Sequence, residues 1–212
     1  MIELHLLTAS GGLAPLADAL MRVVSTTGEV ACSLLGISEP VDVVVRDAAG
    51  APVIREIGMR GTTASAHEVF VSLAPHAFDG TGYQFGRVLA HELHHVARRR
   101  AGATGSTLLD AFVHEGLADH FVDEFIGGAP SPWCCAVDRS ECNAALARAA
   151  KDFDSASVDR RAWMFGAVDQ GLPRWVGYTI GYNLVADYLA SNHEATAAGL
   201  AGARSELFRP QQ

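Results

Sequence analysis

The segment His91-Glu-Leu-His-His95 restricts the possible structure of this chain more than any other part of the sequence. It contains the pattern His-Glu-x-x-His, and it lies in a stretch that begins with Thr81-Gly-Tyr-Gln84, a capping-box pattern, and ends before Gly102. We therefore expect one helix from about Thr81 to Arg100. Positions i and i+4 lie on one face of a helix, so His91 and His95 are expected to point the same way.

Two imidazoles on one helix face are suited to hold a single zinc ion. Glu92 lies on the same side and would be near that ion without binding it. We expect Glu92 to take a proton from the water on the metal and to pass it to a leaving amine. The alternative is a polar helix face with three histidines and no metal. By helical geometry His94 points away from His91 and His95, and it is not assigned to the metal.

A third ligand is expected from the helix that follows. Glu115 is separated from His95 by nineteen residues and occurs in His114-Glu-Gly-Leu-Ala-Asp119. A catalytic zinc site has three protein ligands and one open position, and two histidines with one glutamate are a standard set. Asp119 lies one turn further along, where its carboxylate can accept the second ring N–H of a ligating histidine. The alternative is that both acids are ordinary solvated helix residues. Gly116 is expected to allow close helix approach.

These motifs resemble the gluzincin pattern of the thermolysin-like clan of zinc metallopeptidases. The resemblance implies that His91, His95 and Glu115 bind zinc, that Glu92 is the general base and acid, and that Asp119 supports His91. A narrower resemblance, to a bacterial family of predicted zinc-dependent proteases, rests on HELHH, on EGLADHF and on Gly177-Tyr-Thr-Ile-Gly-Tyr182. It covers about residues 81–190. A metzincin is excluded, because the glycine and third histidine of that motif are absent: the chain has arginine at 98 and alanine at 101.

A peptidase also needs a donor for the oxyanion of its tetrahedral intermediate. Tyr178 and Tyr182 are one turn apart on a late expected helix, and Tyr178 is slightly preferred. Two tyrosines that merely pack a helix face are an equal alternative. The histidines at positions 114, 120 and 193 are further candidates, each more typical of a surface or satisfied histidine.

The rest of the chain indicates an α+β, zincin-like fold of one domain. We expect an N-terminal α/β part over about residues 1–104, a mainly helical part over about residues 105–212, and a cleft between them. The expected elements before residue 81 are strands at Ile2 to Leu7, Val41 to Val45, Val53 to Met59 and Val69 to Leu73, and a helix at Leu13 to Val24. The last of these strands has the pattern of an edge strand beside a cleft. Expected later helices cover Leu108 to Ile126, about Ser140 to Lys151, Arg174 to Leu189, and a final one from Ser191 to before Pro210.

The overall composition limits the partners of the chain. With 212 residues, 49% of them hydrophobic and a net charge of −8, it has no basic stripe of the kind that binds nucleic acid. The N-terminus does not resemble a secretory signal and no apolar run reaches the ~18 residues of a membrane span, so we expect a cytoplasmic protein.

Cys134, Cys135 and Cys142 are expected as free thiols, with a local disulfide or a soft metal site as alternatives. Arg98, Arg99 and Arg100 are expected to complement the helix dipole.

Three functions are compatible with these features. The first is a zinc peptidase that binds an extended peptide against the strand Val69 to Leu73. The second is a zinc-stabilised binding or regulatory module without turnover, which Glu92 argues against because a structural site has no use for a base. The third is a zinc hydrolase of non-peptide amides, which the sequence does not separate from the first.

Overall fold

The structure is a computed structural model that describes residues 2–210. It divides into two compact units, Met1–Arg100 and Ala101–Gln212, and each is described by itself. The first unit has a sheet with helices and the second is helical, which confirms the predicted α+β class.

The first unit is built on a four-stranded sheet with the order β1-β2-β4-β3. The strands are β1 (Ile2–Leu7), β2 (Val41–Asp47), β3 (Met59–Thr63) and β4 (Glu68–Leu73). Strands β1, β2 and β4 are parallel, and β3 is antiparallel to β4. Alternate side chains are buried in β2, where Val41, Val43 and Val45 are fully buried, so one face of the sheet packs against the core.

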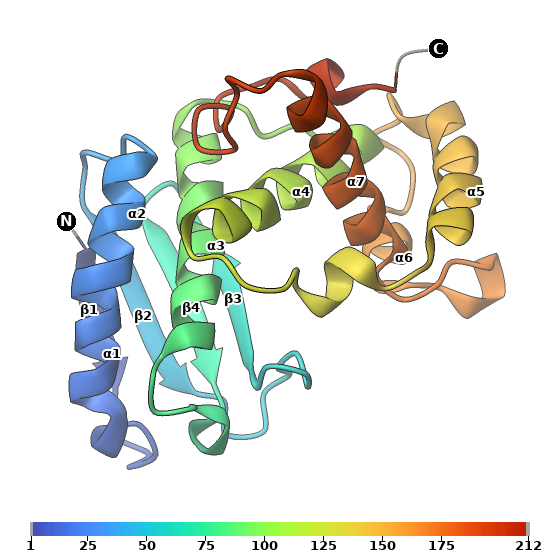
Figure 1. The fold of residues 1–212 in the computed structure, drawn as a ribbon. Helices are drawn as coiled ribbons and strands as arrows, with labels where there is room; N and C mark the ends of the chain where they lie inside the picture. Colours follow the sequence, from blue (N-terminus) through green and yellow to red (C-terminus); the bar gives the residue numbers. More distant parts are fainter. Residues whose placement is uncertain (1, 211–212) are drawn as a thin grey trace. The chain divides into compact units, whose positions relative to one another are not determined.

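Helices cover that buried face, as Figure 1 shows. They are α1 (Ala17–Val23), a π-helical turn (Val24–Gly28), α2 (Glu29–Leu34) and α3 (Tyr83–Arg100). Helix α3 packs on β3 and β4, and its side chains Phe85, Leu89 and Leu93 are fully buried. It confirms the predicted helix that contains the His-Glu-x-x-His pattern. The helix begins at Tyr83, whose N–H donates to the Thr81 hydroxyl at 3.1 Å, and Asp79 accepts from the N–H groups of Thr81 and Gly82.

The prediction that Val69 to Leu73 forms an edge strand is wrong. Strand β4 lies between β2 and β3, so β3 is the edge strand on this side. The strand expected over Val53 to Met59 begins only at Met59, and Ile54 forms a single bridge to that residue. Alternation in β4 indicated one buried face, and it does not distinguish an edge strand from a central one.

The second unit is helical. Its helices are α4 (Leu108–Phe125), α5 (Arg139–Ala149), α6 (Arg160–Phe165) and α7 (Val176–Ser191), with 3₁₀ turns at Pro132–Cys135 and Ser205–Phe208. Thr107 and Asp110 form a complete capping box at the start of α4. Helices α4, α5 and α7 match their predictions to within two residues. The expected final helix is wrong, because residues 192–204 form turns and only a 3₁₀ turn follows.

Close packing of α4 against α7 forms the centre of this unit. A Cβ added at Gly116 would collide with the main-chain carbonyl of Gly181, and one added at Gly181 would collide with that of Phe112. Glycine at both positions therefore lets the two backbones touch. Gly116 thus permits the close approach of α7, whereas the predicted approach was to the helix that carries His91 and His95.

Two further predictions concern the state of the cysteines and the presence of membrane-spanning helices. All four cysteines are free thiols, and burial raises the pKa of Cys134 and of Cys142, so neither ionises readily. None of the helices within residues 2–210 is both long and apolar enough to cross a bilayer.

Candidate metal-binding helix and its surroundings

Helix α3 presents His91 and His95 one turn apart. Their rings lie edge to face with centroids 4.6 Å apart, and one ring nitrogen of each lies within 4.8 Å of the other. A single ion bound at ~2.1 Å by both nitrogens needs them at most ~4.2 Å apart, which lies within this bound. His95 is 6% exposed and His91 is half-buried. The pair can therefore bind one ion between them.

Electrostatics favour the neutral ligand form of His95. Burial lowers the pKa of His95 well below its usual value, and the neighbouring His91 and His94 rings lower it further. A neutral imidazole has a lone pair for a metal, whereas a protonated one has none. His95 is thus ready to bind a cation near pH 7 without first losing a proton.

Glu92 faces the edge strand β3. It is 7% exposed, and the hydroxyl oxygen of Thr63 lies 2.7 Å from its Oε2 and 2.9 Å from its main-chain oxygen. A hydroxyl has one proton to donate and can also accept. When Glu92 is ionised, Thr63 can donate to the carboxylate; when Glu92 is protonated, Thr63 can accept from it and donate to the carbonyl. Such a partner suits a carboxyl group that gains and loses a proton.

Gly61 provides the space for that carboxylate. A Cβ added at this position would lie 2.6 Å from Cγ and 2.8 Å from Cδ of Glu92, closer than real Cβ atoms approach. Only glycine therefore lets β3 lie this close to the Glu92 side chain. Gly61 and Thr63 together fix where the carboxylate points.

The remaining predicted metal residues lie on α4 in the second unit. Glu115 is half-buried and Asp119 is 2% exposed, one turn further along the helix. The indole N–H of Trp133 donates to both carboxylate oxygens of Asp119, at 3.0 and 2.9 Å. The turn that contains Trp133 is fixed in turn by Thr179, whose hydroxyl donates to the Trp133 carbonyl at 3.0 Å. The Asp119 carboxylate is therefore held firmly within its own unit.

The two candidate tyrosines lie on α7 and have different surroundings. The Tyr182 hydroxyl donates to Asp123 at 2.9 Å, and its ring stacks on His120, whose Nε2 lies 2.9 Å from the Tyr182 carbonyl. Burial raises the pKa of Tyr182, and the hydrogen bond to Asp123 raises it further. Tyr178 makes ring contacts with Trp133, next to Asp119. A catalytic role for either tyrosine stays a prediction.

The three arginines form the basic last turn of α3 that the sequence predicts, and they have further partners. Arg98 is completely buried, as is His94, so neither belongs to an exposed helix face. Arg99 donates to the carbonyl of Thr63, and Arg100 donates to three carbonyls of unit 1, those of Ala66, Glu39 and Pro40. These arginines attach the helix end to neighbouring segments in addition to any effect on the helix dipole.

Sequence reasoning missed Thr63, Gly61 and Trp133. None is close in sequence to the residue that it contacts: Thr63 precedes Glu92 by 29 positions, and Trp133 follows Asp119 by 14. A glycine within a β-branched strand signals a close approach, so Gly61 was detectable in principle. For Thr63 and Trp133 the sequence alone has no signal.

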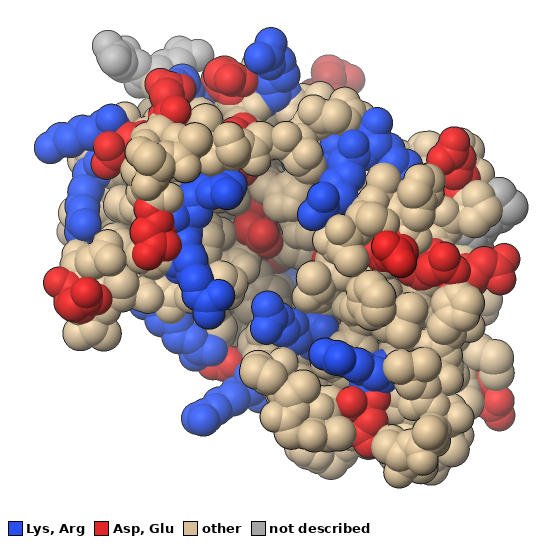
Figure 2. Space-filling model, turned by 180° about the vertical axis from the view of Figure 1, so that it is seen from behind, with Lys and Arg blue, Asp and Glu red and all other residues tan. Residues whose placement is uncertain are grey.

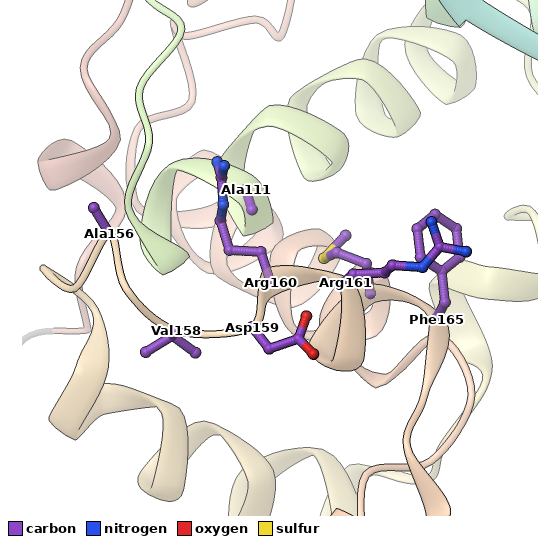
Figure 3. Close-up of a pocket in the computed structure, with 8 residues that line it drawn as sticks. Ala111, Ala156, Val158, Asp159, Arg160, Arg161 and Phe165 are labelled. Atoms are coloured by element: carbon purple, nitrogen blue, oxygen red, sulfur yellow. The ribbon is translucent and has the colours of Figure 1, made fainter.

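The second unit also has an open hollow of about 420 Å³, shown in Figure 3. It is lined by Ala111 of α4, the segment 156–159 and side chains of α6, and Arg161 lies over the Phe165 ring, 5.7 Å from its centroid. None of the predicted site residues lines it. We therefore assign it no part in the predicted chemistry.

Two imidazoles beside a buried carboxylate on one helix are the arrangement typical of a zinc hydrolase. The chain belongs to the family described as "Predicted Zn-dependent protease (DUF2268)", whose model matches residues 23–209. The uncharacterized protein YjaZ of Bacillus subtilis (strain 168) is 29% identical over 155 residues, which are 68% of this chain and 56% of that protein. The aligned part thus spans little more than half the length of that relative. No solved structure matches the chain.

Proposed function

We propose that this protein is a zinc-dependent peptidase of the gluzincin type, in which Glu92 is the general base. The observation with most weight is the environment of Glu92: a buried carboxyl group, held by Thr63 and next to two imidazoles suited to one metal ion. A structural metal site has no need of such a group. The family description supports zinc dependence and proteolysis.

His91 and His95 fit zinc by their donor chemistry and by the neutral form of His95. We propose Glu115 as the third ligand, on the strength of the sequence spacing, and one zinc ion per chain. When bound, zinc supplies a Lewis acid that polarises a carbonyl and acidifies water. Asp119 would accept the second ring N–H of His91 and so fix its tautomer, while Trp133 holds Asp119 in place.

Glu92 would act twice in one cycle. It would accept a proton from the attacking water and donate it to the nitrogen of the departing amine. Thr63 can remain hydrogen-bonded through both states, because it donates to the carboxylate and accepts from the carboxylic acid. This exchange would keep the carboxyl group in one orientation during the proton transfers.

We place the substrate on β3 rather than on β4. Strand β3 is the edge of the sheet and carries Gly61 and Thr63, which contact Glu92. An extended peptide can add to such an edge by main-chain hydrogen bonds, with its scissile bond near the base. For the oxyanion we propose Tyr178 or Tyr182, with a slight preference for Tyr178; the hydroxyl of Tyr182 would have to leave Asp123 to donate to an oxyanion.

The test combines metal analysis with a peptide-library cleavage assay. Purified protein should contain about one zinc per chain and cleave peptides. Glu92→Gln should retain zinc and lose cleavage, while Glu194→Gln, an exposed control with the same chemical change, should leave both unaltered. Full zinc binding by a wild-type protein that cleaves no peptide would refute the peptidase and favour the binding module or a non-peptide amidase. Cleavage by Glu92→Gln would refute the general base.

A further inference from the structure

The face of the sheet away from α1, α2 and α3 carries charge in an ordered pattern. The strand register places Glu3, Asp42 and Glu68 side by side on β1, β2 and β4, and all three are exposed. Neighbouring strands lie about 4.8 Å apart, so three carboxylates in one row repel each other. His5 of β1 offsets part of this, with its Nε2 2.6 Å from Asp42. We call these three residues the acidic row.

A basic row crosses the same face four residues further along the strands. The register aligns Arg46 of β2 with Ser72 of β4 and with Arg60 of β3, and both arginines are exposed. Arg46 donates to the Ser72 hydroxyl at 2.9 Å, which holds its side chain across the face. At about 3.3 Å per residue, the acidic and basic rows are roughly 13 Å apart.

Between the two rows lies a less polar one. It contains His5, Val44, Phe70 and Thr62, aligned across all four strands. The Phe70 side chain is 37% exposed in the middle of a sheet face. Figure 2, in its right half, shows a row of acidic side chains and, below it, basic ones, with uncharged residues between them. The face therefore has acid at one end, base at the other and an apolar pair, Val44 and Phe70, in the centre.

We propose that this face binds the same face of a second copy of the chain. A two-fold axis in the plane of the contact, along the middle row, exchanges the two ends of the face. Phe70 and Val44 would then pack against their counterparts. Asp42 of each copy would meet Arg46 of the other, and Glu68 would lie opposite the Arg46 and Arg60 side of its partner. Glu3 would lie opposite Leu7, which is in line with Arg46, so the pairing satisfies the acids of β2 and β4. The face is therefore complementary to itself over these strands, and to no uniformly charged partner.

The dimensions indicate a weak, reversible dimer. Four strands at about 4.8 Å and six residues at about 3.3 Å make a face of roughly 19 by 20 Å. Two such faces cover roughly 760 Å² in total, below the about 1,000 Å² of a stable specific interface, so we expect a transient dimer that forms only towards high micromolar concentrations. The proposal does not depend on zinc or on peptidase activity, and it fails or holds separately from them.

Two charge-reversed variants, studied separately and then mixed, test the proposed contact between the two sheet faces. Sedimentation or light scattering from about 1 to about 500 μM should show the wild type passing from monomer to dimer. Arg46→Glu with Arg60→Glu makes the face acidic throughout, and Asp42→Arg with Glu68→Arg makes it basic; each should weaken self-association at least tenfold. An equimolar mixture of the two variants should form a heterodimer, since opposite charges then meet at both ends.

The matched control is Arg22→Glu with Arg139→Glu, which changes the net charge equally at exposed helix positions of α1 and α5. It should dimerise as the wild type does. Should a double variant fail to fold by circular dichroism, Asp42→Arg alone, at an exposed strand position, gives the same comparison with a smaller change. A wild type that is monomeric at every concentration, or a dimer that no reversal weakens, would overturn the proposal.

Discussion

Replacing Thr63 by valine removes one hydroxyl group from the contact between β3 and Glu92 while keeping the shape of the side chain. The hydroxyl oxygen lies 2.7 Å from the Glu92 carboxylate, and both residues are less than 10% exposed. A hydrogen bond to a charged acceptor contributes about 1.5–3 kcal/mol, and a buried carboxylate that loses a donor costs a similar amount. We expect zinc-free Thr63→Val to be less stable than the wild type by about that amount.

The same loss should appear in catalysis if Thr63 orients the base. Since about 1.4 kcal/mol corresponds to a factor of ten in rate, the expected fall in kcat/KM lies between about 10-fold and about 150-fold. The fall should be in kcat rather than KM, because the Thr63 hydroxyl contacts the base, whereas the substrate is proposed to bind only the main chain of β3. Zinc content should not change. Thr63→Ser, which restores the hydroxyl, should recover most of the activity.

Two comparisons separate this role from a general weakening of the strand. Thr62→Val removes a neighbouring hydroxyl that donates to the Gly61 carbonyl, and it should leave kcat within about twofold of the wild type. In a Glu92→Gln background, Thr63→Val should cost clearly less stability than in the wild type, because the charged acceptor is gone. Equal effects in both backgrounds, or an unchanged kcat in Thr63→Val, would refute the reasoning.

Three further predictions concern the second unit. Glu115→Ala should weaken zinc affinity by at least about 10-fold in a competitive chelator titration, and an unchanged affinity would identify another third ligand. Trp133→Phe should destabilise the protein by about 1–3 kcal/mol in urea unfolding, because the Asp119 carboxylate loses its indole donor, and a neutral result would exclude the contact. Tyr182 ionises less readily when folded than its usual pKa of 10 indicates, so the unfolded chain loses this proton first and stability should fall as pH rises above about 10. Tyr182→Phe should lessen that slope, by at most about 1.4 kcal/mol per pH unit, and an identical alkaline melting profile would contradict it.

Local sequence signals predicted the long elements of the fold well. The helix that carries His91 and His95 and the helix that carries Glu115 both end within one or two residues of expectation, because apolar periodicity and a glycine or a capping residue define them. The pairing of His91 with His95 also follows from local geometry, since one helical turn alone brings them together. The prediction of a final helix was wrong, because Ser191 and its neighbours resemble a helix cap, yet the segment after Ser191 forms turns.

Tertiary structure decided the features that depend on distant segments. Strand order is one: nothing in the alternation of Val69 to Leu73 shows that a later pairing with β3 makes this strand central. The surroundings of Glu92 are another, because Gly61 and Thr63 reach it only after the edge strand packs on α3. The sequence by itself predicts His91, His95 and Glu92 as metal ligands and base, since one helical turn contains all three. Their hydrogen-bond partners, and the charge pattern across the open sheet face, arise only when separate strands are placed in register.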